Sequence, residues 1–221
     1  MVVLFVVLTI ILFVSIDYFI QRKKKIGLES QPHPGTVSLS RVLSLLPRGV
    51  FIQPSFTWSK LLDSGNLALG IQPILMGLIG EPDEIELLHN GEEVGKNQSL
   101  MKIHKGDKVL TVSSPVKGTI TAINQQILDD PTFENLSQNW VYSIRPENVS
   151  QEVSSWMVAE KAQTWLNEKF NSIRNFFQES APQTAMGVTM ADGGDLPFGV
   201  LSQFDEDVWK KFENEVIGSK K

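Results

Sequence analysis

The sequence predicts a mainly β-structured domain with flanking α-helices, preceded by one transmembrane helix and followed by C-terminal helices. Short apolar and β-branched runs alternate with Gly, Asn, Asp and Pro turn signals between residues 50 and 144. A nearly unbroken apolar run, Val2 to Ile20, precedes this region, and ~20 such residues cross the ~30 Å hydrocarbon layer as a helix. Apolar residues recur at helical spacing from Gln151 to Gln178.

Composition limits the kinds of protein that this chain can be. Of its 221 residues, 42% are hydrophobic and 20% charged, which is typical of a globular protein. The net charge of −5 is not typical of proteins that bind nucleic acid in general. The absence of cysteine excludes disulfides, thiolate metal sites and thiol nucleophiles. We predict a transmembrane anchor with a basic stop at residues 1–25, a linker at 26–48 and a β-domain at 49–147. A long helix follows at 148–180, and an extension with a short strand and a helix at 181–221.

The apolar run has the features of an uncleaved membrane anchor. Its basic cluster, Arg22, Lys23, Lys24 and Lys25, comes after the run, whereas a secretory signal has its charges before it and ends in a small-residue cleavage site. The positive-inside rule then predicts an inner-membrane protein with its N-terminus outside and its domain in the cytoplasm. Asp17 lies inside the run, and it either reaches the headgroup region or contacts a partner helix. These five charged residues are the predicted membrane and partner contacts.

Within the β-domain, the stretch from Met101 to Gly118 predicts a hairpin. It reads as a strand, a tight turn at Gly106-Asp107, a second strand, and Ser114-Pro115 entering a third. Strands are expected near residues 50–52 and 56–62, with a short helical or looped crossing at 74–79. The three histidines have no metal-ligand set at suitable spacing, and they are interpreted as linker or surface residues: His33, His89 and His104.

The segment after the β-domain predicts two helices. Ser150 is a suitable N-cap for the helix from Gln151 to Gln178. Its apolar stripe packs either on the domain itself or on a partner subunit; the stripe contains Ala162, Leu166, Phe170, Ile173 and Phe177. Further on, residues 187–190 resemble a short strand, residues 192–195 a turn, and Asp205 a cap for a last helix.

Several segments resemble the glycine cleavage system H protein family. The matching stretches are Ile85-Glu86-Leu87 with Gly91, Ser114-Pro115-Val116-x-Gly118, and Ile123-Asn124 followed by Asn135 and Trp140. The resemblance implies a lipoyl/biotinyl-type barrel-sandwich hybrid, here in a membrane-anchored relative. It also places Asp107 at the lipoyl-lysine position, with Lys105 and Lys108 on either side.

Three functions compete on these observations. The first is a non-catalytic accessory or scaffold subunit of a bacterial membrane complex, respiratory by analogy, with the membrane and other subunits as partners and no nucleic acid. The second is a lipoylated carrier that shuttles a group between enzymes. The third, a periplasmic export adaptor, is disfavoured by the predicted membrane polarity and by the lack of room for an α-hairpin.

Asp107 has no amine to acylate, so no lipoate or other cofactor is expected, and Lys105 and Lys108 remain the acceptors in the carrier alternative. No nucleophile–base set, phosphate loop or metal cluster is recognised, so no catalytic or metal-binding residue is predicted.

Overall fold

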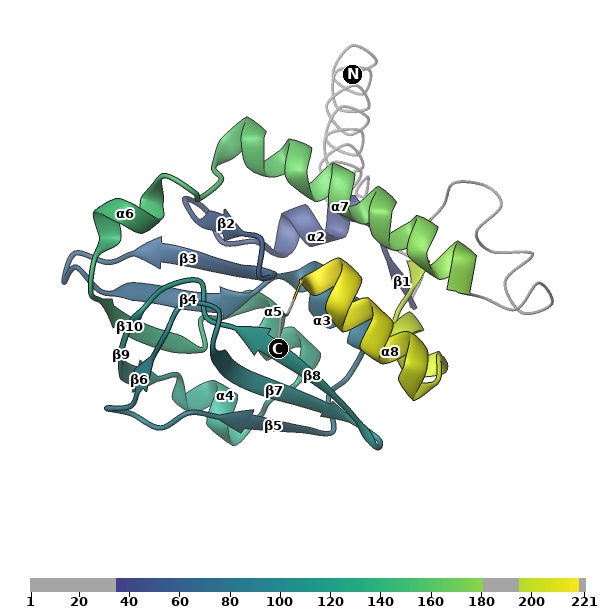
Figure 1. Ribbon diagram of the computed structural model, residues 1–221, viewed down its shortest axis with the longest axis horizontal. Helices are drawn as coiled ribbons and strands as arrows, with labels where there is room; N and C mark the ends of the chain where they lie inside the picture. Colours follow the sequence, from purple (N-terminus) through teal and green to yellow (C-terminus); the bar gives the residue numbers. More distant parts are fainter. Residues whose placement is uncertain (1–34, 181–194, 219–221) are drawn as a thin grey trace, which may run out of the picture. The chain divides into compact units, whose positions relative to one another are not determined.

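Residues 35–180 and 195–218 are described by the computed structural model, and their strands form three sheets (Figure 1). The sheets have six, three and two strands, in the orders β2-β3-β4-β10-β9-β6, β5-β7-β8 and β1-β11. All strand pairs are antiparallel. The predicted mainly β class with flanking helices is confirmed.

The six-stranded sheet supplies much of the core. Its strands are β2 (Phe51–Gln53), β3 (Thr57–Leu61), β4 (Leu67–Ile71), β10 (Tyr142–Pro146), β9 (Gly118–Ile123) and β6 (Glu93–Val94). Every residue of β4 is buried, as expected for a strand that is covered on both faces. Gly70 in β4 faces Trp58 in β3, whose indole lies where a Cβ would stand. The sheet therefore requires glycine at this position.

The three-stranded sheet carries the predicted hairpin. Its strands are β5 (Glu84–Leu87), β7 (Ser99–Lys105) and β8 (Lys108–Ser113). Leu100, Ile103, Leu110 and Val112 are fully buried on its inner side. Tyr142 of β10 joins the two larger sheets, because its hydroxyl donates to the Leu100 carbonyl (3.0 Å) and accepts from the Leu88 amide (2.9 Å). Burial raises the pKa of the Tyr142 phenol, so this group stays a neutral donor.

Helices and a small sheet surround these strands. The helical elements are α2 (Leu39–Leu45), α3 (Pro73–Ile79), α4 (Gln125–Asp129), α5 (Phe133–Gln138), α6 (Val149–Val153), α7 (Ala159–Ser180), η1 (Val200–Gln203), α8 (Glu206–Phe212) and η2 (Glu213–Ile217). The two-stranded sheet pairs β1 (Thr36–Val37) with β11 (Leu196–Pro197). The crossing that the sequence predicts as helical or looped is the helix α3, and every residue of α3 is buried in the core.

The predicted helix from Gln151 to Gln178 is two helices, α6 and α7. Between them, Met157 forms a β-bridge with Ile52, and each main chain donates a hydrogen bond to the other (2.8 and 3.0 Å). Helix α7 then begins at Ala159, which has a left-handed φ of 46°. The prediction of Ser150 as an N-cap is therefore wrong, because Ser150 lies inside α6.

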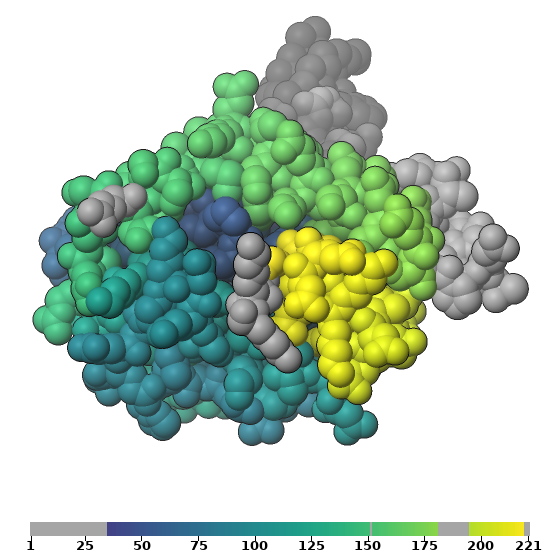
Figure 2. Space-filling view, in the orientation of Figure 1, coloured from purple at the N-terminus to yellow at the C-terminus, as the bar shows by residue number. Residues whose placement is uncertain are grey.

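The apolar stripe of α7 packs on the domain itself. All five predicted members are buried: Ala162, Leu166, Phe170, Ile173 and Phe177. Phe177 also stacks on Phe212 of α8, with ring centroids 5.8 Å apart. In Figure 2, α7 in green lies beside the yellow C-terminal segment. Asp205 caps α8 as predicted, accepting a hydrogen bond from the Val208 amide (2.9 Å).

Some predicted features lie outside the described residues. They are the apolar run Val2 to Ile20 with Asp17, the basic residues Arg22, Lys23, Lys24 and Lys25, and the strand at residues 187–190. Among the helices that the structure does describe, none combines the length and apolar character needed to cross a membrane.

Candidate functional site

The β7–β8 hairpin ends in the two-residue turn that the sequence predicts. Lys105 and Lys108 form the last cross-strand pair, and Gly106 and Asp107 make the turn between them. Gly106 has a left-handed φ of 58°, which glycine adopts without steric cost. Asp107 is exposed at the tip. The hairpin therefore presents a carboxylate to solvent with one lysine on each side of it.

Asp83, which the sequence did not predict as a site residue, lies directly before β5 and binds the hairpin tip. One of its carboxylate oxygens accepts a hydrogen bond from the Gly106 amide (2.7 Å), and the other accepts from the Lys105 amine (2.9 Å). The Gly106 amide, followed by Lys105, holds the pKa of the Asp83 carboxyl below its usual range. A single ionised side chain thus fixes both the turn and the direction of Lys105.

Lys108 is directed to the opposite edge of the same sheet. Its amine donates to the main-chain carbonyls of Ser202 (3.1 Å) and Phe204, and it lies 5.6 Å from the ring centroid of Trp209. The predicted lipoylation candidates therefore have different environments. Lys105 forms an ion pair at the surface, and Lys108 is bound by the C-terminal segment.

A groove lies beside the hairpin, between β8 and α8. Its volume is about 470 Å³, and its lining includes Asp107, Lys108 and Trp209. The lining carries charges of both signs, since Glu206, Lys210 and Glu213 also border it.

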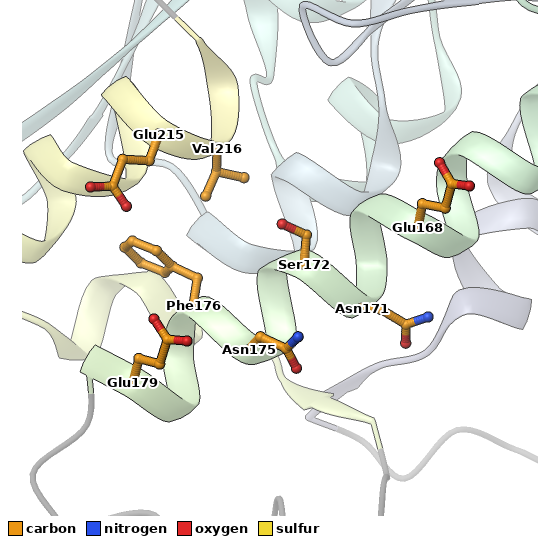
Figure 3. A pocket seen from close by; sticks show the side chains of 8 residues that line it. All are labelled: Glu168, Asn171, Ser172, Asn175, Phe176, Glu179, Glu215 and Val216. Carbon is orange, nitrogen blue, oxygen red and sulfur yellow. The ribbon is translucent and has the colours of Figure 1, made fainter.

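A second hollow of about 560 Å³ separates α7 from η2 (Figure 3). Its walls carry acidic and amide side chains around Phe176: Glu168, Asn171, Ser172, Asn175, Glu179 and Glu215, with Val216. None of these residues belongs to the hairpin, and the sequence signalled none of them as a site.

Both described histidines pair with glutamates, which the sequence did not predict. His89 lies 2.8 Å from Glu92, and His104 lies 2.7 Å from Glu86. Glu86 also pairs with Lys102 (2.7 Å), and Lys102, followed by His104, lowers the pKa of the Glu86 carboxyl. In the described part of the chain, no group of three or more His, Asp or Glu side chains is placed so that it could hold a metal ion.

Sequence comparison identifies similar proteins over the β-domain. The model of the family described as glycine cleavage H-protein matches residues 51–169. A probable glycine cleavage system H protein of Thermococcus gammatolerans is 30% identical over 114 residues, which is 51% of this chain and 85% of the relative. The glycine cleavage system H protein of Psychrobacter sp. is 27% identical over 127 residues, which is 56% of this chain and 100% of the relative. A solved structure of a glycine cleavage system H protein from Mycobacterium marinum is 20% identical and covers 56% of this chain and 99% of its own, with a TM-score of 0.46.

Two predictions are corrected by these findings. The predicted inner-membrane location, with the N-terminus outside and the domain in the cytoplasm, is wrong because the chain matches the family of glycine cleavage H proteins. The prediction of no cofactor is also wrong, because the matching family carries a covalently attached lipoate.

The residues around the tip differ in whether they fit a lipoyl group. Asp107 does not fit, because a carboxylate cannot form the amide bond that attaches lipoate. Lys108 has its amine bound to two main-chain carbonyls. Lys105 fits better, since its side chain is 28% exposed and its ion-pair partner Asp83 is 53% exposed.

Proposed function

The chain belongs to the glycine cleavage H-protein family, and from this membership we propose that it is a non-catalytic lipoyl-type domain that binds partner proteins through the tip of its β7–β8 hairpin. H proteins are carriers that are not catalytic themselves, and they interact with partner proteins. The sequence predicts an accessory subunit, and binding of a partner protein by the hairpin tip agrees with that role.

The observation that carries the proposal is the anchoring of the tip by Asp83. Its carboxylate accepts hydrogen bonds from both the Gly106 amide and the Lys105 amine. The turn is thereby held in one conformation while Asp107 stays exposed. A preorganised loop loses little conformational entropy on binding, which favours contact with a partner.

A second candidate function, the lipoylated carrier, is favoured by the position of Lys105. This lysine is the last residue of β7, directly before the turn. Exposed ion pairs such as that between Lys105 and Asp83 contribute little stability, so the amine can leave its partner at small cost. A lipoyl group held as an amide on Lys105 would supply a dithiolane that carries the transferred group.

Site-specific photo-crosslinking in the native host tests the partner-binding proposal. A crosslinking residue at Asp107 is expected to capture a discrete partner. The matched control is Ser64, which is also exposed in a turn between two strands, β3 and β4. Asp83→Asn should weaken the crosslink from position 107, because it removes the charged acceptor that fixes the turn. Equal capture from both positions, or no capture from position 107, would overturn the proposal.

A further inference from the structure

The segment Leu196–Ile217, called here the C-terminal cap, closes the outer edge of β8. Among the strands that the structure describes, β8 pairs with β7 on one side and with none on the other. On the other side, Trp209 donates its indole hydrogen bond to the Val109 carbonyl (2.9 Å), and the Thr111 amide donates to Glu213 (3.1 Å). An open strand edge is a template for pairing with another chain. Here side chains of the cap occupy that edge.

The same cap binds the Lys108 amine. An ammonium group has three N–H donors, and two of the Lys108 interactions go to the main-chain carbonyls of Ser202 and Phe204. The Trp209 ring contributes a cation–π contact with a centroid distance of 5.6 Å. Acyl transfer requires an accessible amine, and these contacts hold the Lys108 amine against the cap.

Burial of apolar side chains keeps the cap in place. Leu196, Leu201 and Phe212 have no exposed surface, and Trp209 is 1% exposed. Phe177 of α7 stacks on Phe204 as well as on Phe212, with a centroid distance of 5.3 Å to Phe204. Removing several large apolar side chains from water is a strong driving force for this closed arrangement.

We infer that the C-terminal cap binds the Lys108 amine and the β8 edge, so that partners and acylating enzymes contact the hairpin at its tip and at Lys105 in preference to Lys108. The contrast between the lysines supports this assignment. Lys105 pairs with a half-exposed carboxylate at the surface, whereas Lys108 is bound by the main-chain carbonyls of Ser202 and Phe204, two partly buried residues of the cap. The inference deepens the proposed function, because it states which face of the hairpin remains accessible.

Competitive labelling of amines tests the inference on the full-length chain. The native protein is treated with a limiting amount of an acetyl N-hydroxysuccinimide ester, and labelling at each lysine is measured by peptide mass spectrometry. Lys105 should be labelled about tenfold faster than Lys108 or more, because its exposed ion pair with Asp83 opens at little cost, whereas Lys108 must break two hydrogen bonds to main-chain carbonyls of the cap, and about 1.4 kcal/mol of extra cost is a factor of ten. Labelling in denaturant, where neither lysine has its native contacts, gives the ratio of the two rates that is due to local sequence, and the native ratio is divided by it.

Two variants separate the cap from general loosening of the fold. Trp209→Phe removes the hydrogen bond to Val109 and should speed labelling of Lys108 while leaving Lys105 unchanged. Trp165→Phe is the matched control in α7, outside the cap, and should leave Lys108 protected. Equal native rates at the two lysines, or equal acceleration of both by Trp209→Phe, would overturn the inference. No partner protein is present in this assay, so its result is independent of crosslinking from position 107.

Discussion

The indole nitrogen of Trp209 donates a hydrogen bond of 2.9 Å to the main-chain carbonyl of Val109, 100 positions earlier in the chain. Trp209 is 1% exposed, and Val109 lies on the strand that leads away from the hairpin tip. This contact joins the last described helices to the candidate site, so the stability of the C-terminal segment and the geometry of the hairpin are linked.

Substitutions at Trp209 should separate its hydrogen bond from its burial. Trp209→Phe keeps most of the apolar contact and is expected to lower the free energy of unfolding by about 1 kcal/mol, the typical value of one hydrogen bond. Trp209→Ala also leaves a cavity and should cost about 3–5 kcal/mol. Urea denaturation of both variants measures the difference. Equal losses would mean that the hydrogen bond, and not packing, dominates at this residue.

Phe170→Ala should show that the stripe of α7 belongs to the core of the domain. Phe170 is 7% exposed, and truncating a buried aromatic residue typically costs about 3–5 kcal/mol. The next residue, Asn171, is exposed, so Asn171→Ala is a control expected to change stability by no more than about 0.5 kcal/mol. Thermal and urea denaturation compare the two variants. A stable Phe170→Ala variant that loses a partner would instead assign this stripe to an interface.

The contact between Asp83 and the tip should weaken at acid pH. The pKa of Asp83 is lowered in the folded chain, first by the Gly106 amide and then by Lys105. The contact is therefore complete above the ordinary pKa of aspartate, and it is lost as the pH falls through the lowered pKa. Carbon NMR of the Asp83 carboxyl and the amide shift of Gly106 should titrate together.

The variant Lys105→Gln tests whether the Gly106 amide lowers the pKa of Asp83 more than Lys105 does. Because the Gly106 amide has the larger influence, this variant should raise the pKa of Asp83 only part of the way to its ordinary value. Complete return to the ordinary value would mean that the ion pair alone holds the carboxylate.

The carrier candidate predicts the position of the lipoyl group. When the chain is co-expressed with a lipoyl ligase, a lipoyl mass addition should be lost in Lys105→Arg and retained in Lys108→Arg, because Lys108 is bound by Ser202 and Phe204. Intact-mass measurement and peptide mapping locate the group. Lipoylation of Lys108 would contradict the assignment, and no addition in the unmodified sequence would exclude the carrier candidate.

Local sequence signals were sufficient for much of the fold. Lys-Gly-Asp-Lys predicts the hairpin turn, and Asp205 predicts the start of α8. The Gly of the Ser-Pro-x-x-Gly stretch also has a physical reason, because a Cβ at Gly118 would collide with the Arg145 carbonyl on the neighbouring strand. Each signal depends on residues close in sequence or on one matched pair of strands.

Contacts between distant segments could not be predicted in the same way. The pairing of Ile52 with Met157 ends a helix that its own periodicity would continue. Asp83 reaches the hairpin tip from another strand, and Ser202 and Phe204 bind Lys108 through main-chain atoms, which carry no sequence signal. The electrostatic surroundings of both candidate lysines are therefore set by tertiary structure.

The pairing of β1 with β11 determines when the domain can be completed during translation. Thr36 lies opposite Pro197, so β1 emerges from the ribosome long before its partner has been synthesised. Val37 packs against Gly77 of the buried helix α3, yet its own strand remains unpaired until Leu196 and Pro197 have been made. Contacts of such long sequence separation form late and slow the search for the native state. A chain released before residue 196 therefore lacks the strand that completes this sheet and would be a substrate for chaperones or proteases.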